Sequence, residues 1–97
     1  MKTRITDLLD IEYPVVQGAM AMVAFWPLVA AVSEAGGLGI IATITMLDPE
    51  ELRINIRKVK EKTGKPFGVN LIPDNPALDK FLDIITEENV PVVSYGA

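Results

Sequence analysis

Four apolar runs, separated by polar helix-like stretches, most constrain what this chain can fold into. They begin at residues 13, 38, 67 and 90 and cover Tyr13–Gln17, Leu38–Thr43, Phe67–Leu71 and Val90–Ser94. Each run is continuously apolar and rich in β-branched residues, which is typical of parallel strands covered on both faces. A spacing of roughly 25 residues accommodates one strand, one helix and two loops.

Helix-like segments occupy the intervals between these runs. The predicted helices cover Ile5–Leu9, Pro27–Ala35, 48–64 and 75–89. The second and third full helices open with Asp-Pro and Asn-Pro, and a capping side chain followed by proline is typical of a helix N-terminus. Alternating strands and helices predict an α/β fold with a parallel sheet and right-handed crossovers.

Composition excludes several classes of function. The net charge is −4 with no basic cluster, so we expect no nucleic-acid partner. The chain has no Cys and no His, which removes disulfides, a thiol nucleophile and the usual general base. The most apolar stretch, 28–46, is interrupted by Ser33, Glu34 and three glycines, which argues against a membrane span. With no signal peptide visible, we predict a cytoplasmic protein.

Candidate site residues follow from the rule that parallel α/β folds bind ligands at the carboxyl ends of their strands. The turn Gly18-Ala19-Met20 follows the first run, Thr43 ends the second, and Asn70 lies near the end of the third. A glycine permits close approach of a ligand, and a thioether can pad an aromatic ring. From residue types alone, the turn could equally be an ordinary strand-to-helix loop. The Asn70 side chain could equally bind the backbone of the next loop and not a ligand. We predict no metal site.

Two large aromatic residues, Phe25 and Trp26, precede a helix where a small polar cap is usual. Two interpretations remain open from the sequence. The rings either cover the ligand-binding end of the fold or form an exposed patch that meets a partner.

Several segments, in order and with matching spacing, resemble one known family. They are 3–9, 11–20, 30–41, 65–70 and 90–93. The family is nitronate monooxygenase (2-nitropropane dioxygenase), together with its relative, the FMN-dependent enoyl-acyl-carrier-protein reductase. The resemblance extends over essentially the whole chain and does not separate the two activities.

The resemblance implies a TIM barrel that binds FMN at its C-terminal mouth. It places Gly18, Ala19 and Met20 against the isoalloxazine ring and gives Asn70 a hydrogen bond to the flavin. Thr43 would line the mouth, as would Gly96, and Gln17 would stand behind the turn. The implied substrate is a small molecule: an alkyl nitronate undergoing oxidative denitrification, or alternatively an enoyl thioester. The family's catalytic histidine would lie beyond residue 97, so no catalytic residue is predicted here.

Length limits these expectations, because a complete (β/α)8 barrel needs roughly 250 residues. We predict a single partial TIM-barrel domain, residues 1–97, containing (βα)3β4 and weak or inactive alone. Its two strand edges predict a homo-oligomer. Two half-barrels would join edge to edge, exchange elements, or flatten into an open sheet.

A non-enzymatic α/β interaction module is the alternative to an oxidoreductase. A response-regulator receiver is disfavoured, because Gln17 and Asn70 stand where that class needs acidic residues.

Overall fold

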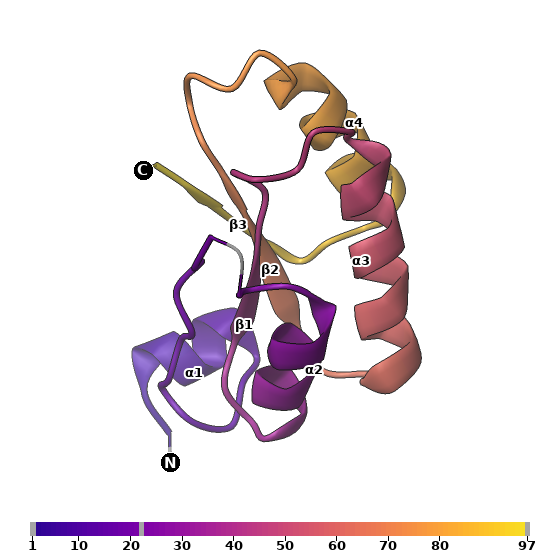
Figure 1. Ribbon diagram of the computed structural model, residues 1–97. Coiled ribbons are helices and arrows are strands. Elements are labelled where there is room, and N and C mark those ends of the chain that lie inside the picture. The colour runs from indigo at the N-terminus through magenta and orange to yellow at the C-terminus, as the bar shows by residue number, and fades with distance from the viewer. Residues whose placement is uncertain (1, 22, 97) are drawn as a thin grey trace.

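The computed structural model describes residues 2–21 and 23–96 and has the predicted alternation of strands and helices (Figure 1). The elements, in chain order, are α1 (Arg4–Leu9), α2 (Trp26–Glu34), β1 (Gly39–Ala42), α3 (Glu50–Lys62), β2 (Phe67–Leu71), α4 (Leu78–Glu87) and β3 (Val92–Tyr95). The strands form one parallel sheet in the order β1-β2-β3.

The first predicted strand, Tyr13–Gln17, is only partly formed. It contributes one parallel bridge, between Val16 and Leu38. The amides of Glu12 and Tyr13 both bond the carbonyl of Gly36, at 3.0 and 2.9 Å, so this stretch is held to a turn and not to a strand. Pro14, which follows, has no N–H to give a ladder. Pairing with β1 therefore starts only at residue 15.

The two faces of the sheet are covered differently. One face packs against α2, α3 and α4, and Ile41, Val69 and Leu71 are buried there in the main apolar core. On the other face Leu38 and Ile40 form a smaller cluster with Ile11, just after α1. Within the described residues, no helix has the length and apolar character needed to cross a membrane.

A side-chain oxygen accepts a backbone amide at or just before the start of each helix, and Thr3 does so for α1. Asp48 Oδ1 accepts the amide of Glu50 at 2.9 Å, and Asn75 Oδ1 accepts that of Ala77 at 2.8 Å. Compared with the predicted starts, α3 and α4 begin two and three residues later, and α1 and α2 begin one residue earlier. The unusual start of α2 is explained by Asn55 of α3, whose Oδ1 accepts the Trp26 amide at 3.0 Å. A neighbouring helix thus supplies the cap that Phe25 lacks.

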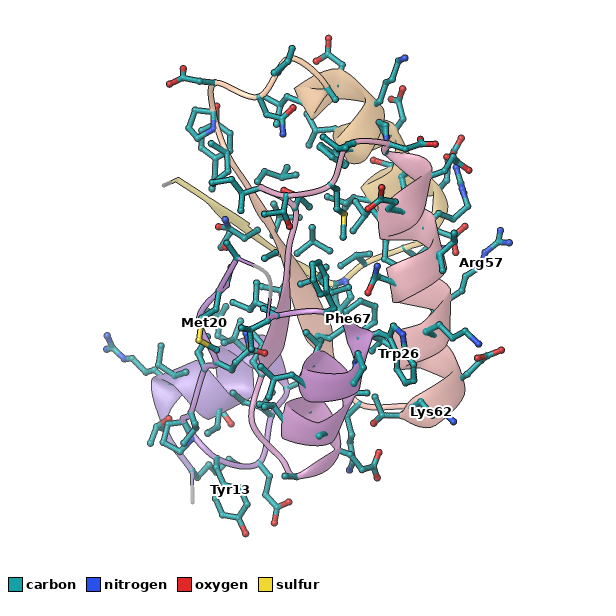
Figure 2. All side chains as sticks on the ribbon, in the orientation of Figure 1. Tyr13, Met20, Trp26, Arg57, Lys62 and Phe67 are labelled. Atoms are coloured by element: carbon teal, nitrogen blue, oxygen red, sulfur yellow. The ribbon has the colours of Figure 1, made fainter. Side chains whose placement is uncertain are left out.

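Neither sequence-based interpretation of Phe25 and Trp26 describes what the structure shows. Both rings are partly buried and pack against the main core beneath the helices. The ammonium group of Lys62 lies 5.9 Å from the centroid of the Trp26 ring, between α2 and α3 (Figure 2). The Trp26 ring therefore joins α2 to α3 on the helical side of the sheet.

The outer edge of β1 is closed by the preceding segment. Its outward amides, those of Leu38, Ile40 and Ala42, bond Val15 O, Gln17 Oε1 and Ala24 O at 2.8, 3.2 and 2.9 Å. The pairing expected between the first and second apolar runs is therefore present in part, and an open outer side of the first run stays a prediction. Among the described residues no strand pairs with the outer edge of β3.

Gly39 allows α2 to lie directly on β1. A Cβ atom at this position would stand 2.4 Å from the carbonyl oxygen of Val29. Because that oxygen belongs to the backbone, it cannot move aside as the end of a flexible side chain could. We expect Gly39→Ala to lower the free energy of unfolding by about 1–3 kcal/mol, measured by urea denaturation. Gly64→Ala is the control, because its Cβ would meet no atom within 4 Å. Equal stability of the two variants would contradict the close approach.

The outer edge of β3 could pair with a second copy of the chain. Val93 and Tyr95 are 44% and 64% exposed on this strand, which carries no charged residue to discourage pairing. We expect the chain to form a two-fold dimer through antiparallel β3 strands, since the closed β1 edge stops further addition. Val93→Lys should reduce the mass measured by light scattering to that of a monomer. Ile54→Lys, at an exposed apolar position on α3, should leave it unchanged.

Candidate functional site

Three side chains lie in a row across the carboxyl ends of the strands. The register pairs Ala42 with Asn70 and Asn70 with Ser94. Residues paired in this way share one face of a sheet, and strand residues alternate between faces. Because Ile41 and Val69 point into the helical core, the row lies on the opposite face. Asn70 and Ser94 are half-buried there.

Hydrogen bonds tie Asn70 to the strands on both sides of it. The hydroxyl of Thr43, which is fully buried, donates to the backbone carbonyl of Asn70 at 2.7 Å. From the other side, the hydroxyl of Ser94 donates to Asn70 Oδ1 at 2.6 Å. Within residues 2–21 and 23–96, Asn70 Nδ2 donates no hydrogen bond. The amide group therefore has an occupied acceptor and a donor left over.

The turn Gly18-Ala19-Met20 lies on the same face as this row. Ala19 packs against the cluster that contains Ile40, whose side chain shares a face with Ala42. A Cβ atom on Gly18 would meet nothing within 4 Å, and Met20 is 45% exposed. Figure 2 shows Met20 on the α1 side of the sheet, away from Trp26 and Lys62. The fold thus brings the predicted turn and Asn70 to one surface.

The side chain of Gln17 holds this turn to the end of β1. Its Oε1 accepts the amide of Ile40 at 3.2 Å, and its Nε2 donates to the Ile40 carbonyl at 3.1 Å. The same Nε2 donates to the carbonyl of Gly18 at 2.5 Å. Gln17 therefore imitates a strand residue and fixes where the turn begins.

The assembled residues can bind and orient a ligand, but they do not move protons. Glycine, alanine, methionine, threonine and asparagine carry no group that titrates near neutral pH. No three His, Cys, Asp or Glu side chains gather into a possible metal site in the described part of the chain. The strand-end rule also points to Ser94, at the end of the fourth apolar run, but only the strand register shows that it lies beside Asn70.

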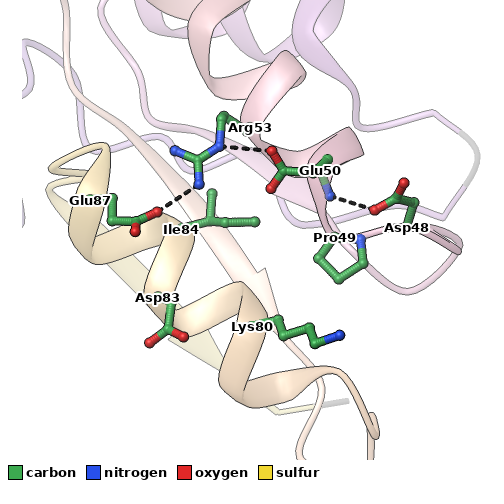
Figure 3. A pocket seen from close by; sticks show the side chains of 8 residues that line it. All are labelled: Asp48, Pro49, Glu50, Arg53, Lys80, Asp83, Ile84 and Glu87. Atoms are coloured by element: carbon green, nitrogen blue, oxygen red, sulfur yellow. Dashed lines mark hydrogen bonds and ion pairs between the residues drawn. The ribbon is translucent and has the colours of Figure 1, made fainter.

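A different hollow, of about 370 Å³, lies between α3 and α4 (Figure 3). Its lining consists of Asp48, Pro49, Glu50, Arg53, Lys80, Asp83, Ile84 and Glu87. The Arg53 guanidinium already binds three carboxylates, those of Glu50, Glu87 and Glu88, at 3.1, 2.6 and 2.7 Å. None of the predicted site residues lines this hollow, and its main cation is neutralised. We interpret these ion pairs as structural contacts that hold α3 to α4, and not as part of a binding site.

Comparison with known proteins identifies the family and the fold. The sequence model of the family described as nitronate monooxygenase matches residues 2–95. The solved structure of FabK from Thermotoga maritima is 50% identical with a TM-score of 0.95 over 100% of this chain and 31% of that chain. The chain therefore has the fold of the N-terminal part of a TIM barrel.

Curated relatives agree with this assignment. A (3aS,4S,5R,7aS)-5-hydroxy-7a-methyl-1-oxo-octahydro-1H-indene-4-carboxyl-CoA dehydrogenase of Mycobacterium tuberculosis is 44% identical over 99% of this chain and 27% of its own length. The nitronate monooxygenase of Pseudomonas aeruginosa is 49% identical over 78% of this chain and 21% of its own. The chain belongs to the nitronate monooxygenase family of oxidoreductases, and it spans less than a third of these relatives.

Because of the ion pairs between α3 and α4, we expect the free energy of unfolding to depend on pH. Hydrogen bonds from Arg57 and Arg53 lower the pKa of Glu88 below its usual value, against the opposing effect of burial. A depressed folded-state pKa stabilises the fold above about pH 4, the ordinary value for Glu, and this contribution disappears as pH falls through the folded-state pKa. We expect Glu88→Gln to be less stable at pH 7 and to lose stability less steeply in acid.

Urea denaturation between pH 7 and pH 2.5 measures this difference. Glu61→Gln is the matched control, because Glu61 makes only an exposed pair with Lys58 at 3.6 Å. Parallel stability profiles for Glu88→Gln and the unaltered chain would contradict the role given to the two arginines.

Proposed function

We propose that this chain forms the flavin-ring side of an FMN-dependent oxidoreductase, with an alkyl nitronate as the substrate class. The observation that carries the proposal is the Asn70 amide at a strand end, with its oxygen occupied by Ser94 and its nitrogen left as a donor. Membership of the nitronate monooxygenase family supports the class of reaction. FMN, when bound, supplies the redox chemistry.

The residues present fit the ring of a flavin. Gly18 leaves open space above the backbone of the turn, and the exposed Met20 thioether offers a polarisable surface for an aromatic face. Asn70 supplies a hydrogen-bond donor to a ring carbonyl or imine nitrogen. This chain's own residues therefore bind and orient the ring, and proton transfer is assigned to no residue among them.

An enoyl thioester is the second candidate substrate class. The 50% identity and TM-score of 0.95 to FabK favour it, as does a relative whose name denotes a carboxyl-CoA substrate. Two hybrid proteins separate the candidates, with residues 1–97 replacing the matched segment of T. maritima FabK or of the P. aeruginosa nitronate monooxygenase. Nitronate-dependent oxygen uptake restored only in the second host supports the proposal. Activity restored only in the FabK host, on an enoyl thioester, replaces it.

Flavin binding gives a direct test on this chain. The candidate residues face a ring and the sequence has no phosphate loop, so FMN and riboflavin should bind with affinities within about threefold of each other. Fluorescence titration measures both. Much tighter binding of FMN would place a phosphate site in these residues and contradict the arrangement, and binding of neither flavin would overturn the proposal.

A change at Asn70 tests the donor itself. Asn70→Asp keeps an oxygen for the Ser94 hydroxyl but removes the Nδ2 donor, so flavin affinity should fall about tenfold, as expected for one hydrogen bond lost and one charge added. Asn89→Asp introduces the same charge after α4, at the far end of the strands, and should change affinity little. Equal affinities in both variants would remove Asn70 from the site.

A further inference from the structure

We propose that Ser94 is a positioning residue, which orients the Asn70 amide so that its nitrogen and not its oxygen faces a bound ligand. This inference rests on the proposed function and deepens it, because it defines the polarity of the site. The ligand atom opposite Asn70 must then be a hydrogen-bond acceptor, such as a ring carbonyl oxygen or an imine nitrogen.

An unrestrained asparagine side chain has two orientations of its amide. Its amide can rotate by half a turn and present either two donor hydrogens or one acceptor oxygen at nearly the same place. A ligand that needs a donor loses binding free energy whenever the oxygen faces it. An adjacent hydroxyl can donate to the oxygen or accept from the nitrogen. One that donates to the oxygen favours the orientation in which the nitrogen faces the ligand.

Ser94 occupies the place where such a hydroxyl is needed. It is the register partner of Asn70 on β3, shares its face of the sheet, and donates to Oδ1 at 2.6 Å. On the other side Thr43 donates to the Asn70 backbone carbonyl at 2.7 Å, which fixes the strand that carries the amide. Neighbouring strands thus hold both Asn70 oxygens, and Nδ2 is the polar side-chain atom that remains.

The sequence around Ser94 supports a specific role for its hydroxyl. Serine interrupts the run Val92-Val93-Ser94-Tyr95, where β-branched and aromatic residues are otherwise favoured. The half-buried Ser94 hydroxyl donates to a half-buried side chain on the neighbouring strand. Valine at this position would pack at least as well in the strand but would leave the amide free to rotate.

Ser94→Ala and Ser94→Thr provide the test, with riboflavin as the probe. We expect Ser94→Ala to weaken riboflavin binding about 3- to 10-fold, the range of one hydrogen bond, and Ser94→Thr to retain binding within about twofold. In an Asn70→Ala background, Ser94→Ala should cause no further loss. Thr86→Ala, which removes a hydroxyl from the outer surface of α4, should leave binding unchanged.

A merely structural role for Ser94 gives a different result. It would weaken binding by the same factor with or without the Asn70 side chain, and that outcome would overturn the inference. Loss of binding in Ser94→Thr equal to that in Ser94→Ala would overturn it too, because the hydroxyl is then not the active group.

A readout without flavin separates this inference from the proposed function. In the NMR spectrum of the ligand-free chain, the side-chain NH₂ resonances of Asn70 should shift in Ser94→Ala and not in Thr86→Ala. An unshifted Asn70 signal would overturn the role of Ser94 even if flavin binds. A shifted signal in a chain that binds no flavin would overturn the proposed function and the positioning of a ligand, while confirming the hydrogen bond.

Discussion

The parallel register of the three strands is the constraint on which the rest of the structure depends. It sets Ala42, Asn70 and Ser94 side by side and thereby brings three strand ends into hydrogen-bonding reach of one another. A shift of one residue would move each side chain to the opposite face and bury Asn70 among the helices. The register is in turn fixed by the apolar residues of the other face, since Ile41 and Val69 fill the main core.

The order of elements could be predicted from the sequence because apolar runs and turn residues are local signals. Three of the predicted strands formed. Asp48 does bind the first turn of α3, and Asn75 binds the amide of Ala77 immediately before α4. The predicted strand at Tyr13–Gln17 formed only in part, for a non-local reason. The carbonyl of Gly36 captures the amides that precede Pro14, and no pattern in the run itself indicates that contact.

The candidate site was predictable in its residue types and not in its connections. The rule about strand ends selected Asn70 and the Gly18 turn, which the structure brings to one face; whether they bind a flavin stays a prediction. It could not show that the Thr43 hydroxyl bonds the next strand, or that Gln17 completes the edge of β1 with its side chain. Such pairings depend on register, which residue types do not specify.

The position of Ser94 on an edge strand links the order of the sheet to the proposed site. β3 is held on one side by β2, and Val93 and Tyr95 remain exposed on it, so opening of this strand costs less than opening of β1 or β2. Each opening withdraws the hydroxyl from Asn70 Oδ1 and frees the amide to rotate. With the proposed role of Ser94, a contact that orders β3 would favour the donor-facing state of Asn70 and so would raise affinity for a ligand at the strand ends.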